Sequence, residues 1–161
     1  MIRIGFGYDV HPFAEGRELW LGGIRIEHTH GLNGHSDADV LIHAICDALL
    51  GAANMRDIGY HFPDTSDDNK NIDSKVLLSE TIRMVRTKCY EPGNIDVTIV
   101  AEHPRLNLYI PEMKITLANV MHIPVDAISI KATTTEKLGF TGREEGIAAY
   151  AVALINYELR R

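Results

Sequence analysis

Two kinds of hydrophobic pattern follow one another along the chain and predict a mixture of strands and helices. Residues 2–10 (IRIGFGYDV) have the composition of a strand that opens the fold. Residues 18–28 (ELWLGGIRIEH) contain two short strand-like runs and predict a hairpin that turns at Gly22 and Gly23. The positions of this hairpin that are expected to point inward are Leu19, Leu21, Ile24 and Ile26.

Three segments carry apolar residues at helical spacing. The first covers residues 37–53, and Ser36 followed by Asp39 three residues later predicts a capping box at its start. A second helix is expected at residues 74–90, ended by the sequence Pro-Gly-Asn, and a third begins near Pro111. The apolar face of the first helix consists of Val40, Leu41, Ala44, Ile45, Ala48 and Leu49.

The second half of the chain predicts further strands. Residues 94–102 alternate between polar and apolar side chains, and residues 127–132 form another short strand. The last segment, residues 147–159, has the length and alanine content of a helix, yet its alternation also suits a strand. Two loops, residues 57–65 and 133–146, are more polar than simple connections require, which indicates a binding role.

Composition adds that the chain is an ordinary globular protein. It has 161 residues, of which 45% are hydrophobic and 24% charged, so one domain covering residues 1–161 is expected. A formal net charge of -6 argues against nonspecific binding to nucleic acid. We expect no membrane span because no stretch approaches the roughly 18 apolar residues that a crossing helix needs.

The cysteines and the first residues of the chain predict a cytoplasmic protein. Cys46 and Cys89 both fall in helical patterns without a Cys-x-x-Cys pair, which favours buried thiols over a disulfide. The first strand starts at once, leaving no room for a targeting leader.

A metal site is predicted from three residues. Side chains at positions i and i+2 of a strand point the same way, so Asp9 and His11 can reach one ion while Val10 faces the core. His43, on a flank of the first helix, can supply a third ligand. One carboxylate and two imidazoles suit zinc with a fourth position open, and Asp39 or Asp47 can hold the second ring nitrogen of His43. By spacing alone, the interpretation of these histidines as solvated or core residues is favoured over a metal site.

Residues 133–146 indicate a polyphosphate site. Thr133, Thr134 and Thr135 offer hydroxyl donors, Arg143 offers a bidentate guanidinium, and Glu136 can hold a hard cation such as Mg²⁺. The alternative is a simple polar strand end. The glycines of residues 5–7 do not complete a dinucleotide fingerprint, and a Walker loop is missing, so phosphates would be held by metals and hydroxyls.

Five segments together resemble one known family. GYDVH, GLNGHSDADVLIHAICDALLGAA, RDIGYHFPDT, NIDVTIVAEHPRL and IKATTTEKLGFTGREEGIA are similar, in order, to the signature segments of the 2-C-methyl-D-erythritol 2,4-cyclodiphosphate synthases. These are zinc enzymes of the non-mevalonate (MEP) pathway, which supplies isoprenoid and terpenoid precursors. The segments cover about half of the chain and reach from one end to the other.

The resemblance implies a phosphorus–oxygen lyase. Its substrate is 4-diphosphocytidyl-2-C-methyl-D-erythritol 2-phosphate, whose 2-phosphate oxygen attacks the β-phosphorus of the diphosphate. The products are 2-C-methyl-D-erythritol 2,4-cyclodiphosphate and CMP. Such an intramolecular phosphoryl transfer gains its rate from alignment and charge neutralisation, which agrees with the lack of an obvious nucleophile.

The resemblance also implies roles for individual residues. Asp9, His11 and His43 match the zinc ligands, and Glu136 matches the contact of a second divalent cation, Mg²⁺ or Mn²⁺, bound with the diphosphate. His35 and Thr134 match the residues that position the diphosphate and stabilise the transition state. Further substrate contacts fall on Ser36, Asp57, Ile58, Gly59, Phe62, Pro63, Asp64, Thr65, Ser66, Ala101, Glu102, His103, Pro104, Arg105, Leu106, Asn107, Thr133, Thr135, Phe140 and Arg143.

A homotrimer follows from the same resemblance. The family fold is α/β (α+β), a single domain whose mixed four-stranded sheet is covered on one face by helices, and the sheets pack around the trimer axis. That packing makes residues 147–159 a strand. The cytidine end of the substrate, held by residues 101–107 and Thr133, is bound by the neighbouring subunit, and the central cavity can hold an isoprenoid diphosphate near Arg143. Two positions depart from the family pattern: Arg105 replaces the usual lysine and Asn107 an apolar residue, which affects cytidine binding.

Two other functions are compatible with the same residues. A zinc hydrolase would use Asp9, His11 and His43 to activate water, and would incorporate oxygen-18 from water into its product. A noncatalytic, metal-stabilised trimer that binds a nucleotide or an isoprenoid would bind CMP without turnover.

Overall fold

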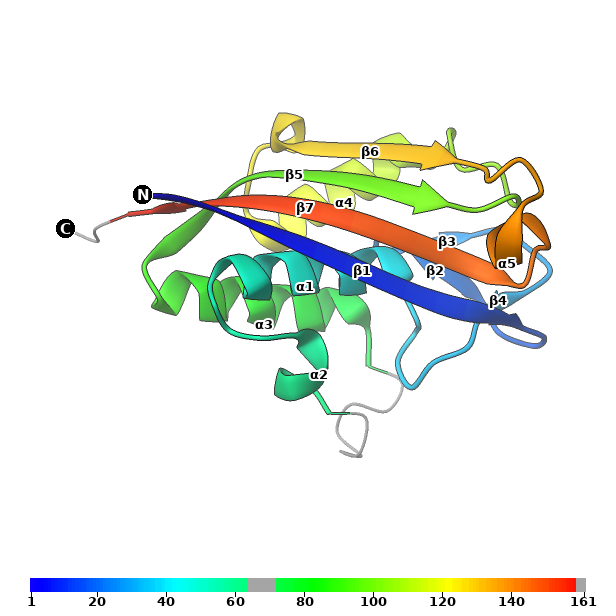
Figure 1. The fold of residues 1–161 in the computed structure, drawn as a ribbon, viewed down its shortest axis with the longest axis horizontal. Helices are drawn as coiled ribbons and strands as arrows, with labels where there is room; N and C mark the ends of the chain where they lie inside the picture. The colour runs from blue at the N-terminus through cyan, green and yellow to red at the C-terminus, as the bar shows by residue number, and fades with distance from the viewer. Residues whose placement is uncertain (64–71, 159–161) are drawn as a thin grey trace.

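A mixed sheet forms one layer of the structure, a computed structural model that describes residues 1–63 and 72–158 (Figure 1). Its strand order is β4-β1-β7-β5-β6, and only the β5–β6 pair is parallel. The four long strands of the prediction are confirmed, and β4 adds a two-residue strand at the β1 edge. The strands are β1 (Ile2–Ala14), β4 (Gly31–Leu32), β5 (Tyr90–Val100), β6 (Ile128–Thr133) and β7 (Gly146–Tyr157).

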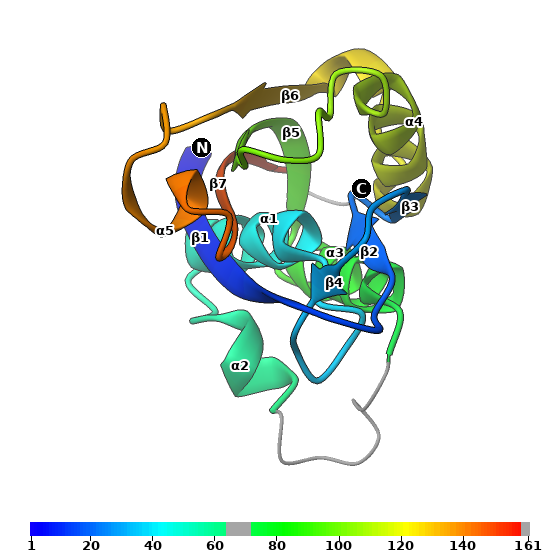
Figure 2. The ribbon, with the colours of Figure 1, turned by 90° about the vertical axis from the view of Figure 1, so that its right-hand side faces the viewer.

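Helices cover one face of this sheet, as Figure 2 shows from the side. Helix α1 packs across β1 and β7, α3 packs against α1, and α4 packs against α3 and β6. Among the described residues no helix has the length and apolar character that crossing a membrane requires. The helices are α1 (Val40–Ala52), α2 (Ile58–His61), α3 (Ser74–Thr87), α4 (Ile110–Met121), the 3-10 turn η2 (Val125–Ala127) and α5 (Gly139–Gly142).

The predicted hairpin is confirmed. Strands β2 (Leu19–Leu21) and β3 (Ile24–Ile26) pair with Leu21 opposite Ile24, so Gly22 and Gly23 alone make the turn. Both glycines have positive φ angles, 62° and 76°, which suit the two-residue turns preferred in hairpins. The four apolar side chains of the hairpin are buried as expected.

The start of α1 differs from the prediction. Its N-cap is Asp39, whose side chain accepts a hydrogen bond from the backbone N–H of Ile42, and not Ser36. The buried Asp39 carboxylate also accepts hydrogen bonds from the backbone N–H groups of Gly22 and Gly23, at 3.0 and 2.7 Å. Asp39 therefore joins the helix start to the hairpin turn, a long-range contact that a local capping motif does not reveal.

Helix α3, which was predicted to cover residues 74–90, is shorter than expected. It ends at Thr87, and Cys89 follows in a turn with a φ of 61°, half-buried and outside the helix. The Pro92–Asn94 segment, expected to end the helix, lies inside β5 at a shift in its pairing with β7. The other cysteine, Cys46, is buried in α1, and burial raises its pKa to about 12. The last segment is the strand β7, as the resemblance implied.

The two faces of β1 carry opposite kinds of residue. The face toward α1 carries Gly5 and Gly7, whereas Val10 lies on the other face, 38% exposed, so the prediction that Val10 faces the core is wrong. Small residues are required toward α1 because the two backbones approach closely: a Cβ on Gly7 would lie 1.9 Å from the carbonyl oxygen of Ala44. The large apolar side chains of β1 consequently face outward.

This close approach predicts a large effect of a small substitution. We expect Gly7→Ala to lower the free energy of unfolding by about 2 to 3 kcal/mol, because backbone atoms of α1 cannot yield to the added methyl group. The matched control is Gly51→Ala in α1, the helix against which Gly7 packs. A Cβ at Gly51 meets nothing within 4 Å, and the free energy of unfolding is expected to rise by up to about 1 kcal/mol. Thermal melting at fixed protein concentration compares the variants, and equal melting temperatures for Gly7→Ala and the unsubstituted protein would contradict the contact.

Candidate metal centre

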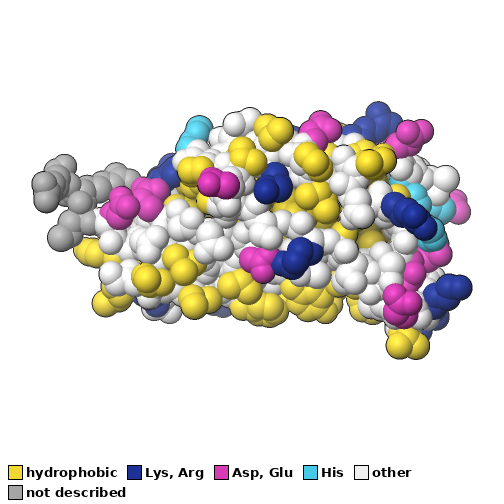
Figure 3. All heavy atoms as spheres, turned by 90° about the horizontal axis from the view of Figure 1, so that it is seen from above, with side chains coloured by type: hydrophobic (Ala, Val, Ile, Leu, Met, Phe, Trp, Pro, Cys, Tyr) yellow, Lys and Arg dark blue, Asp and Glu magenta, His cyan; other side chains and the backbone are white. Residues whose placement is uncertain are grey.

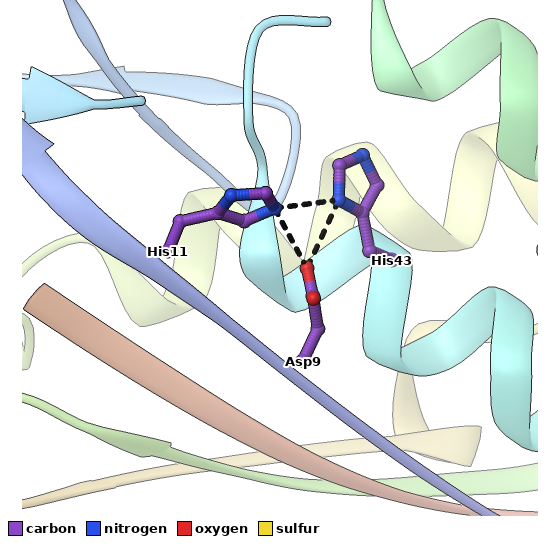
Figure 4. A group of neighbouring side chains, drawn as sticks. All are labelled: Asp9, His11 and His43. Carbon is purple, nitrogen blue, oxygen red and sulfur yellow. Dashed lines mark hydrogen bonds and ion pairs between the residues drawn. The ribbon is translucent and has the colours of Figure 1, made fainter. Parts of the chain in front are cut away.

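Three side chains converge where β1 passes over α1 (Figure 4). Asp9 Oδ2 lies 3.0 Å from His11 Nε2 and 3.0 Å from His43 Nδ1, and the two nitrogens are 3.3 Å apart. Ligands of a tetrahedral zinc with bonds of about 2.0–2.2 Å are roughly 3.3–3.6 Å apart, so these separations are close to those of a metal site. The predicted trio therefore forms a candidate divalent metal site.

Hydrogen bonds turn both imidazoles toward the centre. His11 Nδ1 lies 2.8 Å from the carbonyl oxygen of Asn33, which can only accept, so Nδ1 carries the proton and Nε2 faces Asp9. His43 Nε2 lies 3.0 Å from Ser74 Oγ, while Nδ1 faces Asp9. The two imidazoles direct His11 Nε2 and His43 Nδ1 to one point, which is the arrangement a metal requires.

Neither aspartate predicted to hold the second nitrogen of His43 does so. Asp39 caps α1 and binds the hairpin turn, and Asp47 accepts a hydrogen bond from the backbone N–H of Ile58 at 2.7 Å. Ser74 takes this place instead, from the first residue of α3. The chain gives no local signal for this contact, because Ser74 lies 31 residues after His43 and is brought close only by the packing of α3 on α1.

The Asp9 carboxylate is ionised at neutral pH. Burial acts to raise its pKa, but the hydrogen bonds from His11 and His43 outweigh burial, and the pKa falls to about 2. The side chains of Asp9, His11 and His43 are 25%, 20% and 12% exposed, so the ligand atoms remain reachable from a cavity. One carboxylate oxygen and two imidazole nitrogens fit zinc by ligand type.

A cavity of about 200 Å³ opens beside the three ligands. Predicted contacts gather around it: Ser36 is buried, His35 is exposed, and both follow Gly34 in the cavity wall. Arg17 holds this wall by donating to the carbonyl oxygens of Gly34 and Ser36, at 3.0 and 2.7 Å. Sequence reasoning missed Arg17, which fixes the backbone on both sides of His35.

The loop after α1 closes one side of the cavity. Ile58, Gly59 and Phe62 line it, whereas Asp57 points its side chain to the backbone N–H of Tyr60 as the N-cap of α2. Pro63 is exposed beyond them. The remaining predicted contacts of this loop, Asp64, Thr65 and Ser66, lie outside the described residues.

A second group of predicted residues lies at the end of β5 and β6. Ala101 donates its backbone N–H to the carbonyl oxygen of Thr133, which joins residues 101–107 to the threonine run. Thr134 Oγ1 donates to Glu136 Oε1 at 3.1 Å, and Glu136 has a φ of 54°. Most of the group is exposed, while Ala101 and Leu106 are buried: the members are Ala101, Glu102, His103, Pro104, Arg105, Leu106, Asn107, Thr133, Thr134, Thr135 and Glu136.

The two groups lie apart within one chain. β7 and β5 separate β1, which carries Asp9 and His11, from β6, which leads into Thr134 and Glu136. Three strand spacings correspond to about 14 Å, too far for one diphosphate to contact Glu136 and the three metal ligands directly. Phe140 and Arg143 belong to neither group: they are exposed around α5, and Arg143 Nε donates to Glu145 Oε1 at 2.8 Å.

Comparison with known proteins identifies the family. Residues 2–156 match the model of the YgbB family. The chain is 72% identical over 154 residues, 96% of both chains, to the 2-C-methyl-D-erythritol 2,4-cyclodiphosphate synthase of Parabacteroides distasonis, and 70% identical over 155 residues to that of Bacteroides fragilis (96% of this chain and 98% of the relative).

Solved structures agree. A cyclodiphosphate synthase with bound CDP is 34% identical, with a TM-score of 0.88 over 96% of this chain and all of its own. The bifunctional IspDF of Campylobacter jejuni is 43% identical with a TM-score of 0.95, and this chain spans 98% of its own length but 43% of that larger protein. The metal triad, the fold and these likenesses lead to one conclusion: the chain belongs to the YgbB family, the family of the 2-C-methyl-D-erythritol 2,4-cyclodiphosphate synthases.

Proposed function

We propose that this chain, as one synthase domain over residues 1–161, converts 4-diphosphocytidyl-2-C-methyl-D-erythritol 2-phosphate to 2-C-methyl-D-erythritol 2,4-cyclodiphosphate and CMP. The observation that carries the proposal is the convergence of Asp9, His11 and His43 beside a cavity, in a chain 72% identical to a synthase of that name. The cavity contains polar donors and a metal site, which suit a diphosphate, and its apolar wall suits a methylated carbon chain.

The residues around the cavity act by holding and orienting the substrate. Asp9, His11 and His43 would hold a zinc ion, which would supply a Lewis acid to polarise a phosphoryl oxygen. His35 contacts the diphosphate, with its backbone fixed on both sides by Arg17. Ser36, buried in the cavity wall, contacts the erythritol phosphate together with the loop at Ile58 and Gly59. Alignment of the 2-phosphate against the diphosphate then provides most of the rate.

The second half of the site, we infer, comes from a neighbouring copy. Thr134 stabilises the transition state, and Glu136 holds a second divalent cation, Mg²⁺ or Mn²⁺, on the diphosphate. The loop at residues 101–107 with Thr133 holds the cytidine. Because these residues lie three strands from Asp9 in the same chain, a site that uses both groups requires an interface between chains.

A homotrimer provides such an interface and explains the outer face of the sheet. Hydrophobic side chains gather along one long side of the molecule in Figure 3. The outward positions of β1 and β7 form an apolar stripe, larger than scattered surface residues would give, and its members are Ile2, Ile4, Phe6, Tyr8, Val10, Tyr150 and Val152. A cyclic trimer with these faces around its axis buries the stripe. Its central cavity would take an isoprenoid diphosphate, with Phe140 and Arg143 at the mouth.

Two residues in the loop at residues 101–107 differ from the family pattern and affect the contact with the nucleotide. Arg105 and Asn107 are both exposed, whereas Leu106 between them is buried, so the side chains of Arg105 and Asn107 are available to a ligand. An arginine keeps the phosphate contact of the usual lysine, and the asparagine exchanges apolar packing for a hydrogen bond.

Phosphorus NMR of the metal-loaded protein with the cytidyl substrate tests the activity. We expect resonances of a cyclic diphosphate and of CMP to grow together, and Thr134→Ala to slow both by about a hundredfold to a thousandfold, as loss of one transition-state contact does. CMP beside a linear product carrying oxygen-18 from water would establish the hydrolase instead. CMP binding without turnover would establish the binding protein.

A further inference from the structure

The second ring nitrogen of the metal ligand His43 meets two hydroxyl groups. Nε2 lies 3.0 Å from Ser74 Oγ and 3.3 Å from Ser36 Oγ. Ser74 is fully buried at the start of α3, whereas Ser36 lies in the wall of the cavity. The shorter contact is therefore the one that is shielded from water.

A carboxylate fixes the direction of this contact. Ser74 Oγ donates its proton to Asp37 Oδ1 at 2.5 Å, and Asp37 Oδ2 accepts the backbone N–H of Ser74 at 2.9 Å. A hydroxyl has one proton, so Ser74 Oγ can act toward His43 only as an acceptor. It follows that Nε2 of His43 carries a hydrogen, so that in the neutral ring the lone pair is on Nδ1, the atom that faces Asp9.

We propose that Ser74, held by Asp37, is a positioning residue that sets the tautomer and ring orientation of His43 for metal binding. The proposal deepens the metal site above and rests on it. In most metal sites a carboxylate or carbonyl contacts the ligating histidine directly, whereas here a serine stands between His43 and Asp37. Because Nε2 then carries a hydrogen, the Ser36 hydroxyl cannot donate to His43, and its proton is available to a group in the cavity.

Zinc affinity, measured by competition with a chromogenic chelator, tests this role without the reaction. We expect Ser74→Ala to weaken zinc binding by about tenfold to a hundredfold, the usual effect of removing an outer partner of a ligand. Asp37→Asn, which keeps the shape but removes the charge that directs the Ser74 proton, is expected to weaken binding in the same direction. The matched control is Asp73→Ala: Asp73 caps the same helix end through the N–H of Lys75 without contacting a ligand.

A spectroscopic readout separates positioning from stability. In the cobalt-substituted protein, Ser74→Ala should shift the visible absorption bands of the metal, while Asp73→Ala should lower the melting temperature and leave the bands unchanged. Wild-type zinc affinity in both Ser74→Ala and Asp37→Asn would overturn the proposal while leaving the metal site intact. Failure of the unsubstituted protein to bind zinc would overturn the metal site itself. Should Ser74→Ala not fold, Asp37→Asn alone decides.

Discussion

His43→Ala is expected to remove tightly bound zinc and to lower turnover to about one-thousandth or less of the original rate. Polarisation by a metal contributes several kcal/mol to stabilisation of a charged transition state, which corresponds to three or more powers of ten in rate. With His43 gone, only Asp9 and His11 of the predicted trio remain. Metal content by mass spectrometry and turnover by phosphorus NMR measure the two effects on one preparation.

The fold should survive this substitution, since His43 contributes one partly exposed ring at the edge of α1 and the core side chains of the helix stay in place. The matched control is His30→Ala: His30 contacts Thr29 and Phe13 away from the metal site, and zinc content and turnover should not change. Full activity in a zinc-free His43→Ala protein would contradict the metal assignment.

Most of the order of strands and helices could be predicted from local periodicity, whereas the final strand β7 followed only from the family resemblance. The hairpin at Gly22 and Gly23 and the helix around His43 were predicted with nearly correct limits. Alternation cannot tell which face of a strand is covered, and β1 shows why: its large apolar residues face outward, and glycines face α1. A strand that packs closely against a helix backbone carries its smallest residues on the covered face, which inverts the usual pattern.

The site could be predicted in part. Asp9, His11 and His43 follow from strand and helix geometry, and the structure brings them together. The partners that orient the two histidines could not be predicted, because Asn33 and Ser74 act across 22 and 31 residues through tertiary packing. Thr134 and Glu136 were predicted from their hydroxyl and carboxylate groups as part of a polyphosphate site, but only the family resemblance linked them to the metal site beside β1.

Mixed trimers of two inactive variants should regain activity. His43→Ala damages the metal half of the site and Thr134→Ala the nucleotide half, and each variant alone is expected to be nearly inactive. If every site takes its metal half from one subunit and its nucleotide half from the next, random assembly from equal amounts leaves about one site in four with both halves intact. Co-expression of the two chains should therefore restore about a quarter of the original turnover per site.

This recovery depends on the separation of the two groups within one chain. Strands β7 and β5 lie between Asp9 and the strand that leads to Thr134, so one chain does not bring the two groups together. If the site were formed inside a single chain, mixing the two variants could not restore activity. The control is the double variant His43→Ala/Thr134→Ala, in which one subunit can supply neither the metal half nor the nucleotide half of a site. Mixing it with either single variant should restore no activity. Native mass spectrometry verifies that mixed trimers form, and mixed trimers that stay inactive would refute a site shared between subunits.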